Sequence, residues 1–149
     1  MVDSNKRPHE SLEVYQLAHA LGLRFHAMTF KLPSHELYEE GSQARRSAKS
    51  VSSQIVEGHA LRQYKGEYLH YLARAYASAE ETIEQIRNLL ETGSARRVTD
   101  DCHELSDEYA ILCRKLFNYR SSVQRKHDPS PPFEPREKTP DERSEKDNG

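Results

Sequence analysis

The stretch SQARRSAKSVSSQIVEG, residues 42–58, decides the fold of this protein. It contains five serines and a double arginine, yet its apolar residues recur at four-, three- and four-residue steps, which is the spacing of one helix face. These residues are Ala44, Ala48, Val51 and Ile55. The pattern predicts an amphipathic helix from about Ser34 to Glu57, with Gly58 as the C′ residue that ends it.

A second line of residues on this helix is polar. It consists of Arg46, Ser50, Ser53 and Glu57, again at four-, three- and four-residue steps, and we call it the polar seam. Side chains this small allow two backbones to approach closely with hydrogen bonds between them. Because Glu57 faces the negative end of the helix dipole, a compensating donor is expected, either an arginine from another helix or subunit or the backbone at the start of the next helix. We therefore interpret the seam as a structural or intersubunit packing face.

Arg45 and Lys49 lie one turn apart on a different side from the seam. In one interpretation they face outward and contact backbone phosphates of a nucleic acid. In the other, they and Arg46 pair with nearby acids such as Glu39, Glu40 or Glu80. The charges alone do not decide between these two. Because the seam already assigns Arg46 to packing, Arg45 and Lys49 are the residues expected to make an outward contact.

Three further helical patterns surround this one. The first follows Pro8, with Ser11 as a possible cap and Pro33 at its end. The other two are separated by the turn Thr92-Gly93-Ser94, and Thr99 or Asp100 could cap the last. Their apolar lines are Leu12, Tyr15, Ala18, Leu21, Phe25 and Met28; then Leu69, Leu72, Tyr76, Ala79, Ile83, Ile86 and Leu90; then Val98, Cys102, Leu105, Tyr109, Leu112, Leu116, Tyr119 and Val123.

Strand signals are absent, so the sequence predicts an all-α protein, an antiparallel four-helix bundle over residues 10–125. Residues 1–9 are expected to be a flexible N-terminus. Residues 126–149 hold five of the seven prolines and one large apolar residue, which predicts a disordered, charged tail. The tail carries the whole net charge of −2, so residues 1–125 are neutral and no strongly basic domain indicates nucleic acid.

Composition also limits the compartment and the chemistry. Cys102 and Cys113 lie in one predicted helix about 16 Å apart, beyond disulfide reach, so we expect buried thiols in a reduced, cytoplasmic protein. No run of residues approaches transmembrane length. Glycine-rich phosphate loops, zinc spacings and nucleophile elbows are missing, and the pair Glu67 and His70 stands alone as a di-iron motif. We expect no enzyme, no cofactor and no metal.

Residues 60–71, ALRQYKGEYLHY, interleave Arg62 and Lys65 with three tyrosines. Such a mixture can contact phosphates and stack on bases, so Arg62 and Lys65 join Arg45 and Lys49 as candidate nucleic-acid-binding residues. The alternative is that Tyr68 and Tyr71 flank the core while the two cations are solvated. We favour this alternative because so small a charge pattern is weak evidence for binding.

The helix of residues 42–58 resembles a family of four-helix bundles encoded in intervening sequences of bacterial large-subunit ribosomal RNA. The family signature is approximately Q-x-x-R-A-x-x-S-I-x-x-N-I-x-E-G. It is matched here by Gln43, Arg46, Ser50, Ile55, Glu57 and Gly58, with Val51 in place of isoleucine, while Ser47 and Gln54 depart from it. The resemblance extends from the opening Leu12-Glu13-Val14-Tyr15 and Ala18-His19 through Tyr68, Leu72, Ala75, Ser78 and Glu81, covering about residues 10–120.

This resemblance implies more than the residues do. Proteins of this family resemble one another in forming a closed ring of five bundles, so the resemblance implies a homopentamer. One member, the accessory protein of diversity-generating retroelements, partners a reverse transcriptase. The resemblance therefore implies a non-enzymatic homo-oligomer that binds RNA or a ribonucleoprotein. The alternative is a protein–protein adaptor whose partner contacts the bundle or the Pro-rich tail, without direct nucleic-acid binding.

Overall fold

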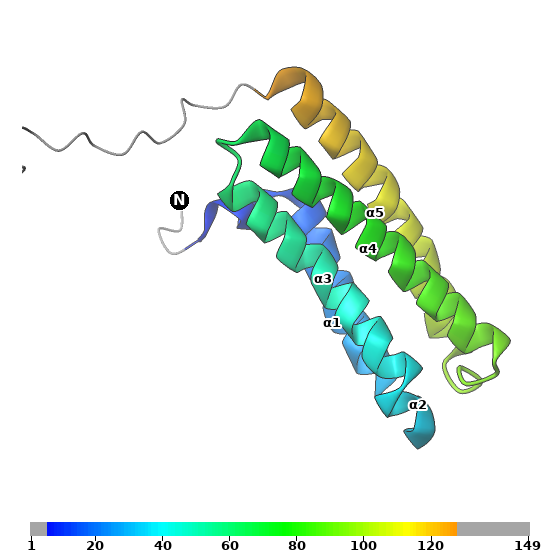
Figure 1. Ribbon diagram of the computed structural model, residues 1–149. Helices are drawn as coiled ribbons and strands as arrows, with labels where there is room; N and C mark the ends of the chain where they lie inside the picture. The colour runs from blue at the N-terminus through cyan, green and yellow to red at the C-terminus, as the bar shows by residue number, and fades with distance from the viewer. Residues whose placement is uncertain (1–5, 128–149) are drawn as a thin grey trace, which may run out of the picture.

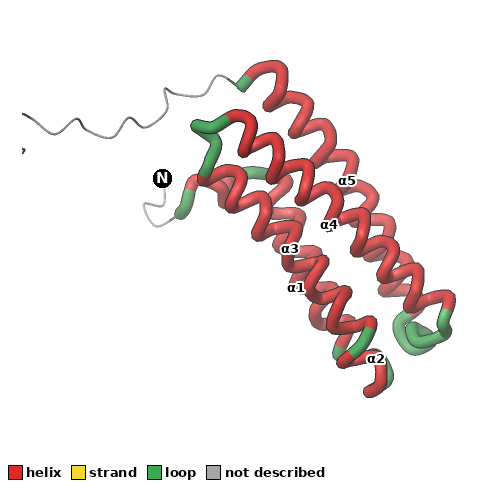
Figure 2. Tube along the Cα trace, in the orientation of Figure 1, coloured by secondary structure: helices red, strands yellow, loops and turns green. Residues whose placement is uncertain are grey.

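The computed structural model describes residues 6–127, which form helices joined by short loops and contain no strand (Figures 1 and 2). The predicted all-α class is confirmed. The elements are the 3₁₀ helix η1 (Pro8–Ser11), α1 (Glu13–Thr29), the short α2 (Ser34–Tyr38), α3 (Glu40–Ala60), α4 (Lys65–Glu91) and α5 (Thr99–Lys126). The tail predicted for residues 126–149 lies outside the described residues, apart from Lys126 and His127.

Each of the four long helices packs against two others. Helix α3 contacts α1 and α4, and α5 contacts α4 and α1, with the most extensive contact between α3 and α4. Figure 1 shows consecutive long helices running in opposite directions along their length. As a result, the α1–α2 and α4–α5 connections lie at one end of the molecule. The α3–α4 connection and the last turn of α5 lie at the other.

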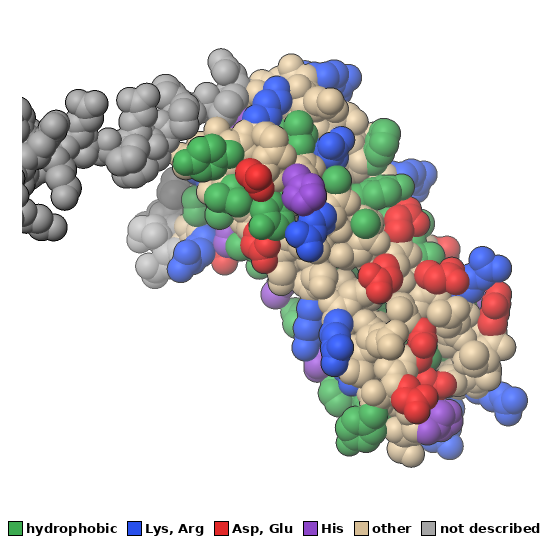
Figure 3. Space-filling model, in the orientation of Figure 1, with side chains coloured by type: hydrophobic (Ala, Val, Ile, Leu, Met, Phe, Trp, Pro, Cys, Tyr) green, Lys and Arg blue, Asp and Glu red, His purple; other side chains and the backbone are tan. Residues whose placement is uncertain are grey.

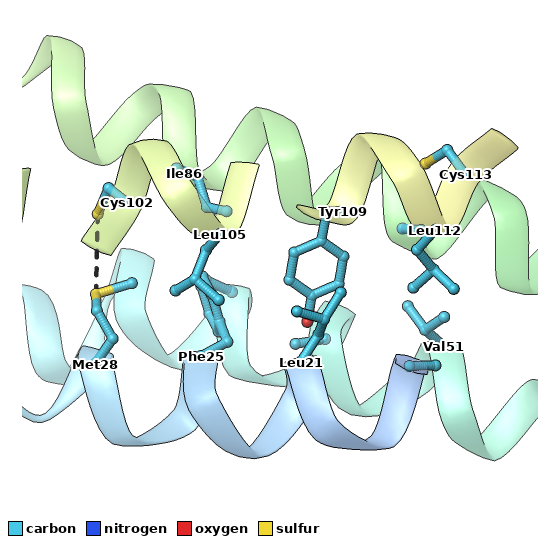
Figure 4. Close-up of a cluster of buried hydrophobic side chains, with 14 of the residues drawn as sticks. Leu21, Phe25, Met28, Val51, Ile86, Cys102, Leu105, Tyr109, Leu112 and Cys113 are labelled. Atoms are coloured by element: carbon cyan, nitrogen blue, oxygen red, sulfur yellow. Dashed lines mark hydrogen bonds between the residues drawn. The ribbon is translucent and has the colours of Figure 1, made fainter. Parts of the chain in front are cut away.

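A single main core runs between the helices, and Figure 4 shows its centre. Leu21 and Phe25 of α1 meet Tyr109 of α5, whose ring stands edge-on to Phe25 at a centroid distance of 6.3 Å. The predicted apolar line of α5 is buried throughout, except that Tyr119 is half-buried. A strict three- and four-residue spacing on a helix that packs against two neighbours is therefore a reliable guide to burial.

Both cysteines are free and buried, as expected. The Sγ atom of Cys102 lies 3.9 Å from Sδ of Met28, inside the core (Figure 4). Burial raises the pKa of the Cys102 thiol to about 11 and that of Cys113 to about 12. Thiols with such pKa values are scarcely ionised at neutral pH and serve as small apolar side chains.

Tyr109 carries a polar atom that the core does not use. Its hydroxyl is buried and has no hydrogen-bond partner within residues 6–127. Replacing it (Tyr109→Phe) keeps the ring contact with Phe25 and removes an unsatisfied group. We expect this variant to be unchanged or up to about 1 kcal/mol more stable in urea denaturation. A loss of more than about 1 kcal/mol would show that the hydroxyl is satisfied in solution.

The core face of α4 differs from the predicted one. Leu72, Ala79 and Ile86 are buried as expected, but Leu69, Tyr76, Ile83 and Leu90 are only half-buried. The buried face is instead completed by smaller or more polar residues: Ala75, Ser78, Thr82, Gln85 and Leu89, together with Tyr68. The helix is rotated because its closest neighbour is α3, and side chains of this size allow that close approach.

Several helix ends also differ from expectation. Ser11 does not cap α1. It lies in η1, where its hydroxyl donates to the Pro8 carbonyl, and Pro8 and His9 are therefore ordered within the expected flexible N-terminus. Thr99 is the first residue of α5, and its hydroxyl donates back to the Ala95 carbonyl. The Thr92–Ser94 turn is confirmed, with Gly93 at φ +78°, a conformation that glycine adopts without strain.

The helix predicted from Ser34 to Glu57 is broken at Glu39, whose φ of −100° and ψ of −105° are not helical. Helix α2 ends there and α3 begins at Glu40. Beside the break, a Cβ atom on Gly41 would lie 2.6 Å from the Glu36 carbonyl oxygen, so the two segments meet backbone to backbone. Periodicity does not reveal this break because the apolar line continues past it.

Candidate nucleic-acid interface

Two polar residues of α3, Ser47 and Gln54, bond to α4. The Thr82 hydroxyl donates to Oγ of Ser47 at 3.1 Å, inside the core. One turn along, the Ser78 hydroxyl donates to Oε1 of Gln54 at 2.9 Å. These bonds join the two helices across small side chains, so Ser47 and Gln54 are polar residues of α3 that pack within the chain.

Gly58 belongs to the same contact and does not end α3, which continues to Ala60. It is buried, and a Cβ atom placed on it would lie 2.8 Å from Cβ of Tyr71 on α4. This distance is shorter than two such atoms tolerate, so the crossing of α3 and α4 requires glycine here. The prediction of Gly58 as a C′ residue is wrong; its role is close packing.

The polar seam lies at the surface of the chain. Arg46, Ser53 and Glu57 are exposed and Ser50 is half-buried, with its hydroxyl donating to the Arg46 carbonyl of its own helix. Together with Lys49, Gln54 and Arg74 of α4, they line an open depression of about 440 Å³, which we call the α3–α4 groove. The seam therefore does not pack within the chain, and its intersubunit role stays a prediction.

The groove has an excess of positive charge. Its lining holds the cations Arg46, Lys49 and Arg74 against the single carboxylate of Glu57. None of these four forms an ion pair with another described residue. The alternative in which Arg45, Arg46 and Lys49 pair with Glu39, Glu40 or Glu80 is therefore not observed among the described residues. The Ser53 hydroxyl also lines the groove and can donate to an anion, whereas the Ser50 hydroxyl already donates to the Arg46 carbonyl.

The acidic side chains of this face lie elsewhere. Most exposed acids of α4 come after Arg74, at Glu80, Glu81, Glu84 and Glu91, and only Glu67 comes before it. Figure 3 shows most of the red side chains of this face over its lower half, toward the α4–α5 connection. The groove thus lies in the less acidic half of a chain whose described helices are nearly neutral overall.

Arg45 does not point outward, contrary to expectation. Its Nη2 donates to the Leu37 carbonyl at 2.7 Å and its Nη1 to the Thr29 hydroxyl at 3.1 Å. The guanidinium also lies 5.5 Å from the centre of the Phe30 ring. Arg45 therefore fastens the end of α1 and the end of α2 to α3, and of the double arginine it is Arg46 that faces solvent.

Arg62 and Lys65 do not join the groove lining. They lie at the α3–α4 connection, where Nη1 of Arg62 donates to the His59 carbonyl at 2.9 Å and so caps α3. Burial lowers the pKa of His59, and the adjacent charge of Arg62 lowers it further. Tyr68 cannot stack on a base from its position, since it is buried with its hydroxyl 2.5 Å from that of Tyr119.

The family of the chain follows from its match to known families. The model of the family described as 23S rRNA-intervening sequence protein matches residues 10–118. The chain belongs to this family. No curated protein matches it. The resemblance inferred from the signature of residues 43–58 is thereby confirmed.

The family signature describes the two sides of α3 in this member. Ile55 and Gly58 are buried in the core and at the α4 crossing, whereas Arg46 and Glu57 are exposed. The two departures from the signature, Ser47 and Gln54, are the residues that hydrogen-bond to α4. The signature therefore records helix packing as much as surface chemistry.

Arg74 is the groove residue that sequence reasoning missed. It lies on the predicted α4, seventeen residues beyond Glu57, and nothing in its own neighbourhood singles it out. The signal that could have found it is the short α3–α4 connection, which makes the two helices antiparallel neighbours and places the first half of α4 beside the second half of α3.

Two further observations bear on function. Within residues 6–127, no group of three or more His, Cys, Asp or Glu side chains is placed to hold a metal ion. No helix in the same part of the chain is both long and apolar enough to cross a bilayer.

Proposed function

We propose that this protein is a non-enzymatic RNA- or ribonucleoprotein-binding protein. In this proposal the four long helices form an antiparallel bundle, and five copies of the chain assemble in a ring. The α3–α4 groove binds RNA phosphates. The family description, which refers to 23S ribosomal RNA, supports RNA as the nucleic acid. The observation that carries the proposal is the groove itself, with three cations and one carboxylate.

The groove has the chemistry that a phosphate backbone requires. Arg46, Lys49 and Arg74 are free of ion pairs within the described chain, so binding RNA does not first require an internal pair to be broken. Cations that neutralise phosphates release counterions, which is the main source of sequence-independent affinity. Repetition of the groove in a homo-oligomer would multiply this effect without a basic net charge on the chain.

The first test removes the three charges and keeps most of the side-chain length, in a variant with Arg46→Gln, Lys49→Gln and Arg74→Gln, the groove variant. Fluorescence anisotropy of a labelled RNA hairpin measures Kd between about 50 and 200 mM salt, the range over which phosphate binding weakens strongly. We expect Kd to rise at least about tenfold at low salt. The slope of log Kd against log salt should fall by about one for each phosphate that the variant no longer neutralises.

The matched control removes three exposed cations outside the groove, at Lys6, Arg125 and Lys126. It changes the net charge equally and should leave Kd within about twofold, because long-range charge is screened beyond about 10 Å at 0.1 M salt. If both variants bound RNA equally weakly, net charge and not the groove would account for the binding. Absence of hairpin binding by the unchanged protein at low salt would refute the RNA proposal.

A second surface supports the homo-oligomeric part of the proposal. An apolar groove of about 430 Å³ between α4 and α5 is lined by Tyr76, Ile83, Ala110, Cys113 and Phe117, with Glu80, Arg114 and Asn118 at its polar positions. The Phe117 side chain is 62% exposed. Large apolar groups gathered in a surface groove are typical of protein–protein interfaces.

Light scattering tests this part directly. We expect the protein at micromolar concentration to have about five times the 17.2 kDa mass of one chain. Phe117→Arg should shift the mass toward that of a monomer, because a cation in an apolar interface is costly to desolvate. Leu23→Arg, at a similarly exposed position on α1, is the control and should leave the assembly intact. A monomeric unchanged protein would refute the ring.

The second candidate function is a protein–protein adaptor, for example a partner of a reverse transcriptase, and the same α4–α5 groove favours it. In that case the groove would accept a different protein and the chain would not bind RNA directly. Such a complex should survive nuclease treatment and fail to form with Phe117→Arg. A complex that dissociates on nuclease treatment would favour the RNA proposal instead.

A further inference from the structure

A second polar cavity lies at the end of the molecule where the α1–α2 and α4–α5 connections meet (Figure 1). Its volume is about 440 Å³, and we call it the loop-end cavity. One wall consists of Lys31, Leu32, Pro33 and Ser34, and the other of Gly93, Ser94, Arg96 and Arg97. None of these residues lines the α3–α4 groove.

Hydrogen bonds hold the second wall in place. The Ser94 hydroxyl donates to Oε1 of Glu36 at 2.7 Å, which ties the α4–α5 connection to α2. The Thr92 hydroxyl donates to Oγ of Ser94 at 3.2 Å. Beneath them, Leu32, Ala95 and Val98 are buried in the core. The backbone walls of the cavity are therefore in place before any ligand arrives.

The charge at this cavity is of one sign. Lys31, Arg96 and Arg97 line it and no carboxylate does, since the Glu36 carboxylate is turned onto the Ser94 hydroxyl. Asp100 and Asp101 follow in the first turn of α5. None of the three cations forms an ion pair with them or with any other residue from 6 to 127. Three like charges around one hollow repel each other, and an anion between them relieves that repulsion.

Arg96 is placed by the turn beside it. Its guanidinium lies over Gly93, where a Cβ atom would be 3.3 Å from Nε of Arg96. Because Gly93 has φ +78°, glycine both permits the turn and leaves room for this guanidinium at the cavity wall. Guanidinium groups match the oxygens of phosphate with paired hydrogen bonds, and Lys31 opposite adds a compact charge.

We propose that the loop-end cavity binds a phosphate group, carried either by free phosphate or by RNA. Three cations, with the Ser34 hydroxyl and no carboxylate in the lining, suit a small, multiply charged anion, and they disfavour apolar or cationic ligands. The inference does not rest on the proposed function, because the cavity lies outside the α3–α4 groove.

The first experiment uses inorganic phosphate and the full chain. Melting temperatures are compared in phosphate and in chloride at equal ionic strength. Phosphate at about tenfold over its Kd should raise the melting temperature by about 3 to 6 °C. The shift should vanish in the loop-end variant, Lys31→Gln, Arg96→Gln and Arg97→Gln, whose replaced side chains are exposed and therefore dispensable for folding. It should persist in the groove variant.

The second experiment distinguishes the two sources of phosphate. The RNA hairpin is offered with a 5′-phosphate and with a 5′-hydroxyl, and anisotropy gives Kd for the unchanged protein and for the loop-end variant. A rise of about tenfold in the variant for either hairpin assigns the cavity to RNA phosphate. An unchanged Kd for both, with the phosphate-dependent melting shift still abolished, assigns it to free phosphate.

Two outcomes overturn the inference. One is a melting temperature that phosphate does not raise beyond chloride. The other is a shift that persists in the loop-end variant or disappears in the groove variant, since either result places the bound phosphate elsewhere. Failure of the groove variant to weaken RNA binding refutes the proposed function and leaves this inference standing, so the two failures are separable.

Discussion

Gly58→Ala is expected to destabilise the protein by about 1–3 kcal/mol, the range for overpacking a close contact. The new methyl group would lie 2.8 Å from Cβ of Tyr71. Because that atom is fixed to the α4 backbone, it cannot move aside as the end of a flexible side chain would. The helices α3 and α4 must then separate, which also lengthens the Thr82–Ser47 and Ser78–Gln54 hydrogen bonds. Urea denaturation followed by circular dichroism measures the destabilisation.

The same chain supplies a matched control in Gly66, the second residue of α4. A Cβ atom on Gly66 meets nothing within 4 Å. Gly66→Ala should therefore stabilise the protein by about 0.5–1 kcal/mol, because alanine restricts the unfolded chain and favours the helix. The two substitutions are chemically identical and opposite in expected sign. A Gly58→Ala protein as stable as Gly66→Ala would show that α3 and α4 do not cross as closely as described.

Arg45→Ala is expected to cost about 2 kcal/mol, in the range for hydrogen bonds made by a charged group. The substitution removes the donors to the Leu37 carbonyl and the Thr29 hydroxyl, and with them the connection between α1, α2 and α3. Helix α2 has no buried residue of its own, so it should lose order first. Amide hydrogen exchange of residues 34–38 should accelerate more than that of the core of α3.

The neighbouring Arg46→Ala is the control for this prediction. Arg46 is exposed and forms no ion pair within residues 6–127, so its removal should change stability by no more than about 0.5 kcal/mol. Its effect should instead appear in RNA binding. Equal destabilisation in both variants would contradict the division of the double arginine into one structural and one solvent-facing residue.

The contacts of Arg45 show how much a helical pattern can predict. Spacing alone assigned Arg45 to the outside and Arg46 to a packing seam, since it gives only the angle of each residue around the axis of α3. The position of Arg45 depends on α2, because the chain breaks at Glu39 and α2 covers the side of α3 from which Arg45 projects. A break of this kind depends on contacts with other segments and leaves no mark in the apolar spacing.

The buried face of helix α5, in contrast, could be predicted from its spacing. It packs against both α1 and α4 with large apolar residues, so its spacing predicted its buried line almost completely. Helix α4 was harder because small polar residues, Ser78 and Thr82, make its buried hydrogen bonds to α3. Hydrophobicity undervalues such residues, and the predicted face was therefore turned toward Leu69 and Ile83.

By itself, the sequence determined the all-α class, the four long helices, the buried free cysteines and the family. Each of these depends on local spacing or on a motif within one segment. Only the tertiary structure decided that Ser47, Gln54 and Gly58 form the close contact with α4. It also decided which cations share a surface: Arg74 lines one groove with Arg46 and Lys49, and Lys31 lines one cavity with Arg96 and Arg97. The physical reason is that packing distance and charge clustering depend on residues far apart in the chain, whose register is set when the helices pack.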